Sequence, residues 1–223
     1  MNGRSERVVR TLRRILRHDG GVAMVEFALC LPFVVGLTMA GAELANYTTT
    51  KMRVSQLALM VADNASRIGA GSTLNAKTIS EAQINDLLAG AGLQGGRLNL
   101  FQHGRVIVSS LQPTTNPSQY AIKWQRCRGV KAATSTYGDV GEQTSGITAN
   151  GQLITAPSDG AVMFVEINYS YQPLVSSAFV PHSEIREIAA MTVRDNRDYT
   201  GGTDGIYNAE GVTASDCSTY SAS

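Results

Sequence analysis

The chain has 223 residues and a formal net charge of +1 at pH 7, a length that allows one domain with appendages or at most two small domains. Its positive charge is concentrated at the start. Residues 1–19 hold six arginines against two acidic residues, and the chain after residue 21 has 13 Lys/Arg against 16 Asp/Glu. Because no folded basic region accompanies the arginine run, the composition argues against a nucleic-acid-binding protein.

An apolar segment follows the arginines. Residues 22–42 carry a single charge, Glu26, and as a helix they would span about 32 Å, close to the roughly 30 Å core of a bilayer. An arginine-rich flank tends to stay in the cytoplasm. We therefore expect a basic cytoplasmic leader (residues 1–21), the transmembrane half of an N-terminal helix (residues 22–45) and a periplasmic α+β domain (residues 46–223).

The helical pattern continues beyond the apolar segment. Apolar residues recur at helical spacing, at Val54, Leu57, Ala58, Val61, Ala65 and Ile68. Gly69 and Gly71 are expected to end the helix. The pattern predicts one helix over about residues 22–68, roughly 70 Å long. Pro32 lies inside it and is expected to kink it, because proline removes one backbone hydrogen bond.

A second, shorter helix is predicted to follow. Thr78 and Glu81 have the spacing of a capping box, in which two side chains bond the first free backbone N–H groups of a helix. Gly90 and Gly92 are expected to mark its end. Its apolar stripe consists of Ile84, Leu87 and Leu88.

The next apolar stretches predict a β-hairpin. Residues 106–111 and 120–127 flank a turn rich in Pro, Thr and Asn, as two antiparallel strands do. Ile122 and Trp124 share one alternation along the second stretch, and we expect both in the core.

The clearest strand covers residues 163–171, where apolar and polar residues alternate and predict one buried face. Tyr169 and Tyr171 are expected on that face. Residues 185–194 are expected to pair with this strand, although their pattern is also compatible with a helix. The connection over residues 128–160 is too long to lack structure in a compact domain, and we expect it to be functional or partly ordered.

Three cysteines divide between the two regions. Cys30 lies in the apolar segment, and Cys127 and Cys217 lie in the expected periplasmic domain. Two cysteines in an oxidising compartment favour one disulfide, worth about 4–5 kcal/mol as an upper value in the chain-entropy model. Two free buried cysteines are the alternative. No CxxC or HxxxH pair accompanies them, so no metal site and no cofactor are expected.

The start of the apolar segment carries a more specific signal. Residues 21–27, GVAMVEF, resemble a type IV prepilin processing site, with a glycine followed by an apolar helix that has glutamate at its fifth position. The longer stretch RRILRHDGGVAMVEFALCLPFVVGL resembles the start of TadE-like minor pseudopilins of the tight-adherence (Flp, type IVc) pilus system. INYSYQPL is similar, more weakly, to that family's C-terminal strand. No Asp-x-Ser-x-Ser metal motif of the related TadG-like proteins occurs.

This resemblance implies a pilin-like α+β fold, with a long N-terminal transmembrane helix packed on an antiparallel β-sheet. It implies cleavage between Gly21 and Val22 by a prepilin peptidase, after which Glu26 pairs with the new amine of Val22. Phe27 and Pro32 would serve helix packing during assembly. Glu26 could instead lie near the membrane boundary without a partner, and Phe27 and Pro32 could be ordinary membrane-helix residues.

The implied function is that of a minor pseudopilin in the assembly of an adhesive Tad/Flp pilus. Its partners would be the prepilin peptidase, major and minor pilin subunits, and the inner membrane, before it reaches the pilus or cell surface. Two alternatives stay open. One is a secreted protein cut after Ala42, and the other is an uncut, single-pass envelope protein with a binding role. His103 and His182 accompany no catalytic motif, so no enzyme is expected.

Overall fold

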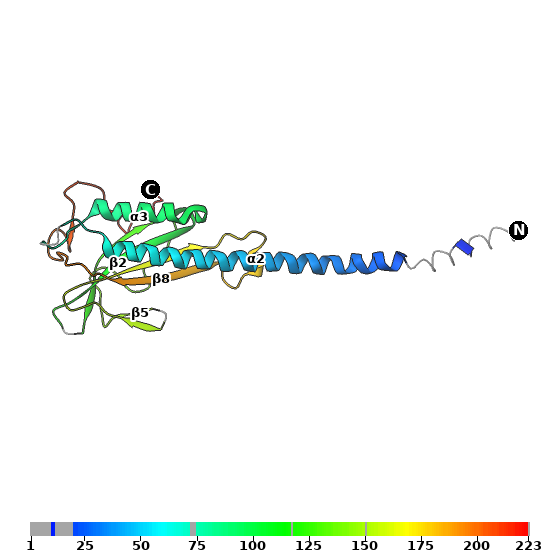
Figure 1. Ribbon diagram of the computed structural model, residues 1–223, viewed down its shortest axis with the longest axis horizontal. Helices are drawn as coiled ribbons and strands as arrows, with labels where there is room; N and C mark the ends of the chain where they lie inside the picture. Colours follow the sequence, from blue (N-terminus) through cyan, green and yellow to red (C-terminus); the bar gives the residue numbers. More distant parts are fainter. Residues whose placement is uncertain (1–9, 12–19, 72–74, 117, 150, 223) are drawn as a thin grey trace.

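The computed structural model describes residues 10–11, 20–71, 75–116, 118–149 and 151–222. Most of the expected leader, residues 1–21, lies outside the described residues. The chain has an α+β fold in which one long helix projects from a body of sheet and shorter helices (Figure 1).

Helix α2 (Gly20–Arg67) is continuous over 48 residues, which confirms the single long helix expected from the sequence. Pro32 lies inside it. Because proline has no N–H, the carbonyl of Ala28 lacks its usual partner. The helix nevertheless continues, and no break or sharp kink is visible in the ribbon of Figure 1.

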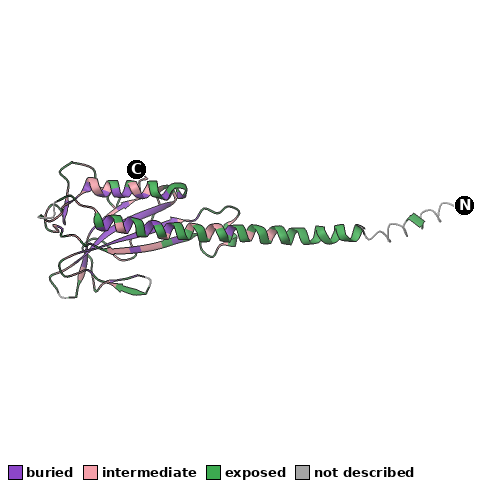
Figure 2. Cartoon of the chain, in the orientation of Figure 1, coloured by how far each residue is buried: buried purple, intermediate pink, exposed green. Residues whose placement is uncertain are grey.

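The two halves of α2 differ in burial (Figure 2). Between residues 21 and 42 no side chain is buried, whereas the second half is covered on one face by the body. The buried residues of that face include five of the six positions in the predicted stripe, and Ile68 packs at its edge. The buried apolar residues of this face are Val54, Leu57, Ala58, Val61, Ala62 and Ala65.

The main sheet has five strands in the order β4-β3-β2-β7-β8, and all neighbours are antiparallel. The strands are β2 (Gly104–Pro113), β3 (Tyr120–Arg128), β4 (Gln143–Thr144), β7 (Val162–Ser170) and β8 (Glu184–Thr192). The predicted hairpin is therefore confirmed as β2 and β3. The stretch after residue 184 is a strand paired with β7, which resolves the open choice between strand and helix.

Helix α3 (Glu81–Gly95) begins and ends later than expected. Its N-cap is Ser80, which accepts a hydrogen bond from the N–H of Gln83, while the Gln83 side chain accepts one from the N–H of Ser80. Thr78 cannot be the cap, because its backbone is already paired with Ala70. At the other end the helix continues past Gly92, whose missing Cβ leaves room for the ring of Phe101.

Short elements complete the body. β1 (Ile79–Ser80) pairs with β9 (Ile206–Tyr207), and β5 (Ile147–Ala149) pairs with β6 (Gln152–Ile154). The remaining elements are η1 (Gly96–Leu98), α4 (Leu100–His103) and η2 (Ser177–Phe179). The connection after β3 therefore contains short strands, as expected of a partly ordered segment.

Strand β7 is buried on both faces, which corrects the expectation of a single buried face. On one face, Val165 and Ile167 belong to the core beneath α2 and α3. On the other, Phe164 packs in a second cluster with residues of β3 and β5. Glu166 also lies on this second face, where the Ser135 hydroxyl donates to it at 2.5 Å, and burial raises its pKa.

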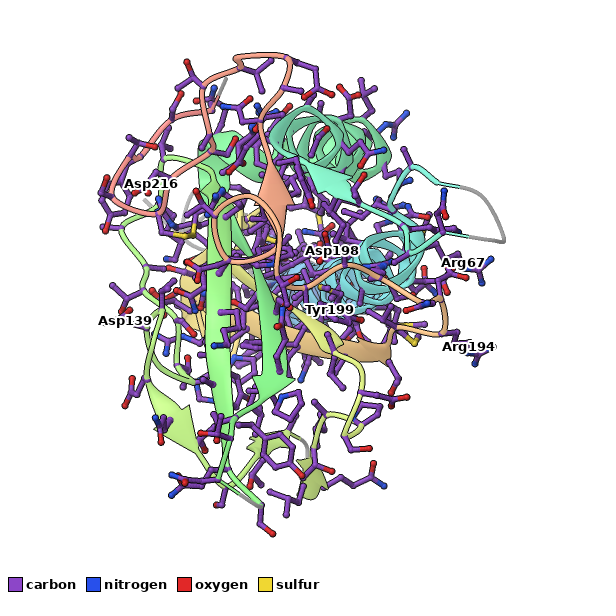
Figure 3. The ribbon with its side chains drawn as sticks, turned by 90° about the vertical axis from the view of Figure 1, so that its left-hand side faces the viewer. Arg67, Asp139, Arg194, Asp198, Tyr199 and Asp216 are labelled. Carbon is purple, nitrogen blue, oxygen red and sulfur yellow. A yellow bond between two sulfur atoms is a disulfide. The ribbon has the colours of Figure 1, made fainter. Side chains whose placement is uncertain are left out.

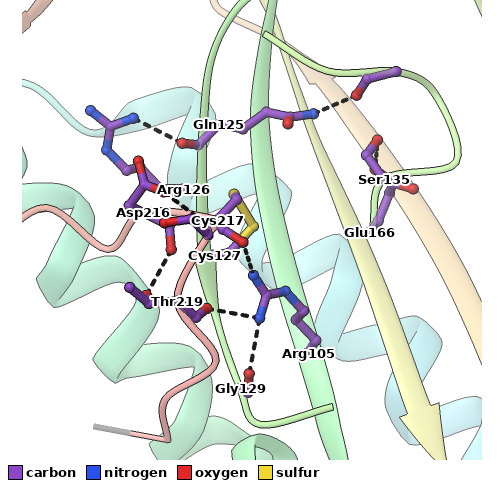
Figure 4. Close-up of a disulfide and its surroundings, with 12 residues drawn as sticks. Arg105, Gln125, Arg126, Cys127, Gly129, Ser135, Glu166, Asp216, Cys217 and Thr219 are labelled. Carbon is purple, nitrogen blue, oxygen red and sulfur yellow. Dashed lines mark hydrogen bonds between the residues drawn. A yellow bond between two sulfur atoms is a disulfide. The ribbon is translucent and has the colours of Figure 1, made fainter. Parts of the chain in front are cut away.

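A disulfide ties the C-terminal tail to the sheet (Figure 4). Cys127 on β3 is bonded to Cys217, with 4.7 Å between their Cα atoms. Beside it, the buried guanidinium of Arg105 donates to the carbonyls of Gly129, Cys217 and Thr219. The last described residues are therefore held against β2 and β3 by one covalent bond and several hydrogen bonds.

Candidate functional site

The first half of α2 carries a continuous run of exposed apolar side chains. Large apolar side chains point outward all around it, at Val22, Met24, Val25, Phe27, Leu29, Leu31, Phe33, Val34, Val35, Leu37 and Met39. We call residues 21–42 the bare half of α2. A helix that is apolar on every side is suited to lipid or to a bundle of other helices.

The residues singled out in the sequence lie between the start and the middle of the bare half. Gly21 and Val22 occupy the first turn, and Glu26 lies four residues after Val22, so the side chains of Val22 and Glu26 share one face. Phe27 is 66% exposed, and Pro32 follows between Leu31 and Phe33. The helix thus places a carboxylate one turn beyond the expected cleavage point. The roles of these five residues stay predictions.

The hydroxyl of Thr38, within the bare half, is satisfied inside the helix. The Thr38 hydroxyl donates to the carbonyl of Val34 at 2.7 Å. This bond within the helix removes the need for an outside partner, which is the usual way for threonine to reside in an apolar environment.

Glu43 marks the point where the bare half meets the body, and its role was missed from the sequence. Its side chain is fully buried although its neighbours Ala42 and Leu44 are exposed. Its Oε1 accepts from the Tyr171 hydroxyl at 2.5 Å and from the N–H of Leu174 at 3.2 Å. Its Oε2 accepts from the N–H groups of Val175 at 2.6 Å and Ser176 at 3.3 Å. Four donors therefore surround one carboxylate.

Tyr171 joins this cluster to the helix a second time. Its hydroxyl accepts a hydrogen bond from Asn46, one turn after Glu43, and its ring packs edge-on against Tyr47 at 5.1 Å between centroids. Burial, followed by the hydrogen bond to Glu43, raises the pKa of Tyr171 to about 12, so the hydroxyl stays a donor at physiological pH. Tyr171 was expected in the core and is buried, but its hydroxyl also has this anchoring contact.

The opposite end of the body is charged. Figure 3, which looks onto this end, shows Arg67, Arg194 and Asp198 around the end of α2. A cleft here is lined by residues that include Arg67, Lys77 and Asp195, and its charges are largely paired with one another: Arg67 with Asp63, and Lys77 with Asp195. Because these charges are already paired with one another, we assign no ligand to this cleft.

Together these features define a class of protein: an α+β body joined to an apolar helix. Among the described residues, this is the one helix whose length and composition would allow it to cross a membrane. Residues 21–70 match the family model of TadE-like proteins. The match begins at the expected processing site and ends just after α2, and it confirms that this segment is TadE-like. No curated protein and no solved structure matches the chain.

Proposed function

We propose that the protein is a minor pseudopilin that takes part in the assembly of an adhesive Tad/Flp pilus. The observation that carries this proposal is the continuity of α2, whose bare half joins the packed half without a break. Such a helix can lie in lipid before assembly and among the helices of major and minor pilin subunits afterwards. The TadE-like match over residues 21–70 supports the same conclusion.

The proposal includes cleavage by a prepilin peptidase between Gly21 and Val22. A carboxylate at the centre of a membrane helix costs roughly 2.5–3.5 kcal/mol and less near its end. Cleavage creates an ammonium on Val22, one turn from Glu26, and the two opposite charges then offset part of each other's cost. Only a processed subunit has this amine, so Glu26 would favour the incorporation of processed subunits.

The proposed orientation places the arginine-rich leader in the cytoplasm and the body in the periplasm, with α2 in the inner membrane between them. The charge rule for membrane helices supports it. The Cys127–Cys217 disulfide supports it independently, because such bonds form in oxidising compartments. The assigned role is structural: we infer no catalytic activity and no cofactor.

A single substitution tests the role of Glu26. Glu26→Gln keeps the size and polarity of the side chain but removes its charge, and we expect normal membrane insertion with strongly reduced incorporation into pili. Leu29→Gln is the matched control, since it places the same amide in the bare half and leaves Glu26 intact. Quantifying the protein in membrane and sheared-pilus fractions compares the two variants. Wild-type incorporation of Glu26→Gln would disprove the pairing.

A further inference from the structure

The connection between β7 and β8 lies beside α2 at the end of the body nearest the bare half (Figure 1). It begins with Tyr171 and continues through residues 172–183, QPLVSSAFVPHS, which we call the 172–183 loop. None of these 12 residues is Asp, Glu, Lys or Arg. The loop therefore differs from the charged opposite end of the body.

Apolar side chains of this loop point away from the protein. Leu174 is 69% exposed, Val175 44% and Phe179 41%. Three large apolar residues are thus exposed within six positions, and this local concentration favours contact with an apolar medium over contact with water.

The contacts of Glu43 fix the level of the loop along α2. The backbone N–H groups of Leu174, Val175 and Ser176 all donate to its carboxylate. Glu43 is the residue that directly follows the apolar segment, so these three residues lie level with the end of the bare half. If the bare half spans the bilayer core, the loop lies at the bilayer surface.

The polar groups of the loop are arranged for such a position. Three of its N–H groups are bonded to Glu43, and the Ser176 hydroxyl accepts from the N–H of Ala178. Charged groups begin directly after the loop, where Glu184 pairs with Lys131 and Arg186. The loop thus has hydrogen-bonded backbone N–H groups and apolar side chains, and the charged residues lie just beyond it. This order matches the change from acyl chains to headgroups at a bilayer surface.

We propose that the 172–183 loop is a second membrane contact, in which Leu174, Val175 and Phe179 enter the interfacial region of the same bilayer that α2 crosses. The occupant of the patch is lipid. The loop then sets the tilt of the body on the membrane, because it adds a contact beside the single helix. This inference rests on the membrane crossing included in the proposed function.

The test places a fluorescent probe on the loop of the full chain in lipid nanodiscs. Cys30→Ser removes the free thiol, and a single cysteine is then introduced and labelled with the environment-sensitive fluorophore NBD, with the Cys127–Cys217 disulfide kept intact. Leu174→Cys reports on the loop. Leu174 and the two control positions described below are exposed, so labelling should not disturb the fold. Phospholipids with a spin label on the acyl chain quench only probes that reach the bilayer.

Two positions serve as controls. Leu37→Cys, within the bare half, is expected to be quenched. Val140 lies at the end of the sheet away from the bare half, because the N–H of the next residue, Gly141, donates to the carbonyl of Ile122 near the start of β3. The probe at Val140→Cys is therefore expected to be unquenched. The inference predicts that the probe at 174 behaves like the probe at 37, with blue-shifted emission and strong quenching by the spin-labelled lipid.

The other outcomes overturn distinct statements. If the probe at position 37 is quenched by the lipid while the probe at position 174 stays unquenched like the probe at position 140, the loop does not contact lipid, although the membrane crossing stands. If the probe at 174 is blue-shifted but not quenched, protein such as a second copy covers the patch, and the inference is equally wrong. If neither 37 nor 174 is quenched, the membrane crossing fails and the proposed function fails with it.

Discussion

Glu26 and Glu43 are two carboxylates on one helix in opposite situations. Glu43 is fully buried and is surrounded by four neutral donors from Tyr171 and the 172–183 loop. Glu26 is exposed in the bare half, and its proposed partner is an amine that exists only after cleavage. One glutamate therefore fixes the structure of the subunit, and the other is proposed to act in assembly.

At the residue scale, Glu43→Gln is expected to loosen the 172–183 loop. Each carboxylate oxygen accepts hydrogen bonds from two donors. In either orientation of a glutamine side chain, its NH₂ group would therefore face two donors and could accept from neither. Hydrogen exchange of the full chain should show the amides of residues 174–176 exchanging faster by roughly tenfold or more, because their charged acceptor is lost. Glu210→Gln, an exposed position, is the control. Unchanged exchange at residues 174–176 would contradict the anchoring role.

The sequence alone could not reveal this anchor. Glu43 and Tyr171 are 128 residues apart, and no local pattern connects them. Periodicity placed Tyr171 correctly in the core, but periodicity reports which face a side chain occupies and not which polar group its hydroxyl meets. Contacts of this kind depend on how the chain folds back, which a single sequence does not show.

At the scale of elements, helices were predicted better than their ends. The stripe along α2 persists over many turns, so its register leaves little ambiguity. The start of α3 was misplaced by two residues because two capping-box patterns overlap, one beginning at Thr78 and one at Ser80. The backbone of Thr78 is paired with Ala70, so Thr78 cannot act as the cap. Glu81, which was expected to complete the box, instead forms an ion pair with Arg126.

Alternation along β3 was interrupted in a way that the sequence did not show. Ile122 pairs with Leu111 and Trp124 pairs with Ser110, so Lys123 is an extra residue that forms a bulge. As a result Ile122 and Trp124, both buried as expected, pack in different clusters on opposite faces of the sheet. The prediction of burial was correct, but the prediction of a shared alternation was wrong.

The cap of α3 gives a direct test of its boundary. Ser80→Ala should destabilise the body by about 1 kcal/mol, the usual cost of losing an N-cap hydroxyl. Thr78→Ala should cost less, because its hydroxyl makes only one long contact of 3.4 Å. Thermal unfolding of the full chain in detergent, followed by circular dichroism, compares the two. An equal or larger effect at Thr78 would favour the cap position first expected from the sequence.

Packing of α3 on α2 gives a larger expected effect. Leu88 is fully buried in the core between the helices and the sheet, and Leu93 on the same helix is 84% exposed. Leu88→Ala should cost about 2–5 kcal/mol, since it leaves a cavity, whereas Leu93→Ala should stay within about 0.5 kcal/mol. The same unfolding measurement distinguishes them. Similar melting temperatures for both variants would show that α3 does not pack as described.

At the scale of the whole molecule, one helix joins two regions with different requirements. The bare half needs an apolar medium, and the body is held together by a core on each side of the sheet and by the Cys127–Cys217 bond. The sequence indicated this division because composition changes sharply after residue 42. It did not show that the long connection after β3 covers the second face of the sheet.

Loss of the disulfide should weaken the body without affecting the bare half. The double variant Cys127→Ser/Cys217→Ser opens a loop of 90 residues in sequence separation, and the expected cost is about 2–5 kcal/mol. Cys30→Ser should leave the melting temperature unchanged, because Cys30 is free and exposed. A melting temperature that does not respond to the double variant would mean that Arg105 and its carbonyl partners hold the tail by themselves.

The intact mass of the membrane-associated protein, measured with and without an active prepilin peptidase, tests the central claim most directly. The account predicts a species that begins at Val22 and appears only when the peptidase is active. A chain that keeps its start near Met1 in both cases would mean an uncut membrane anchor, and a chain that begins at Glu43 would mean a secreted protein. Either result would contradict the pseudopilin assignment.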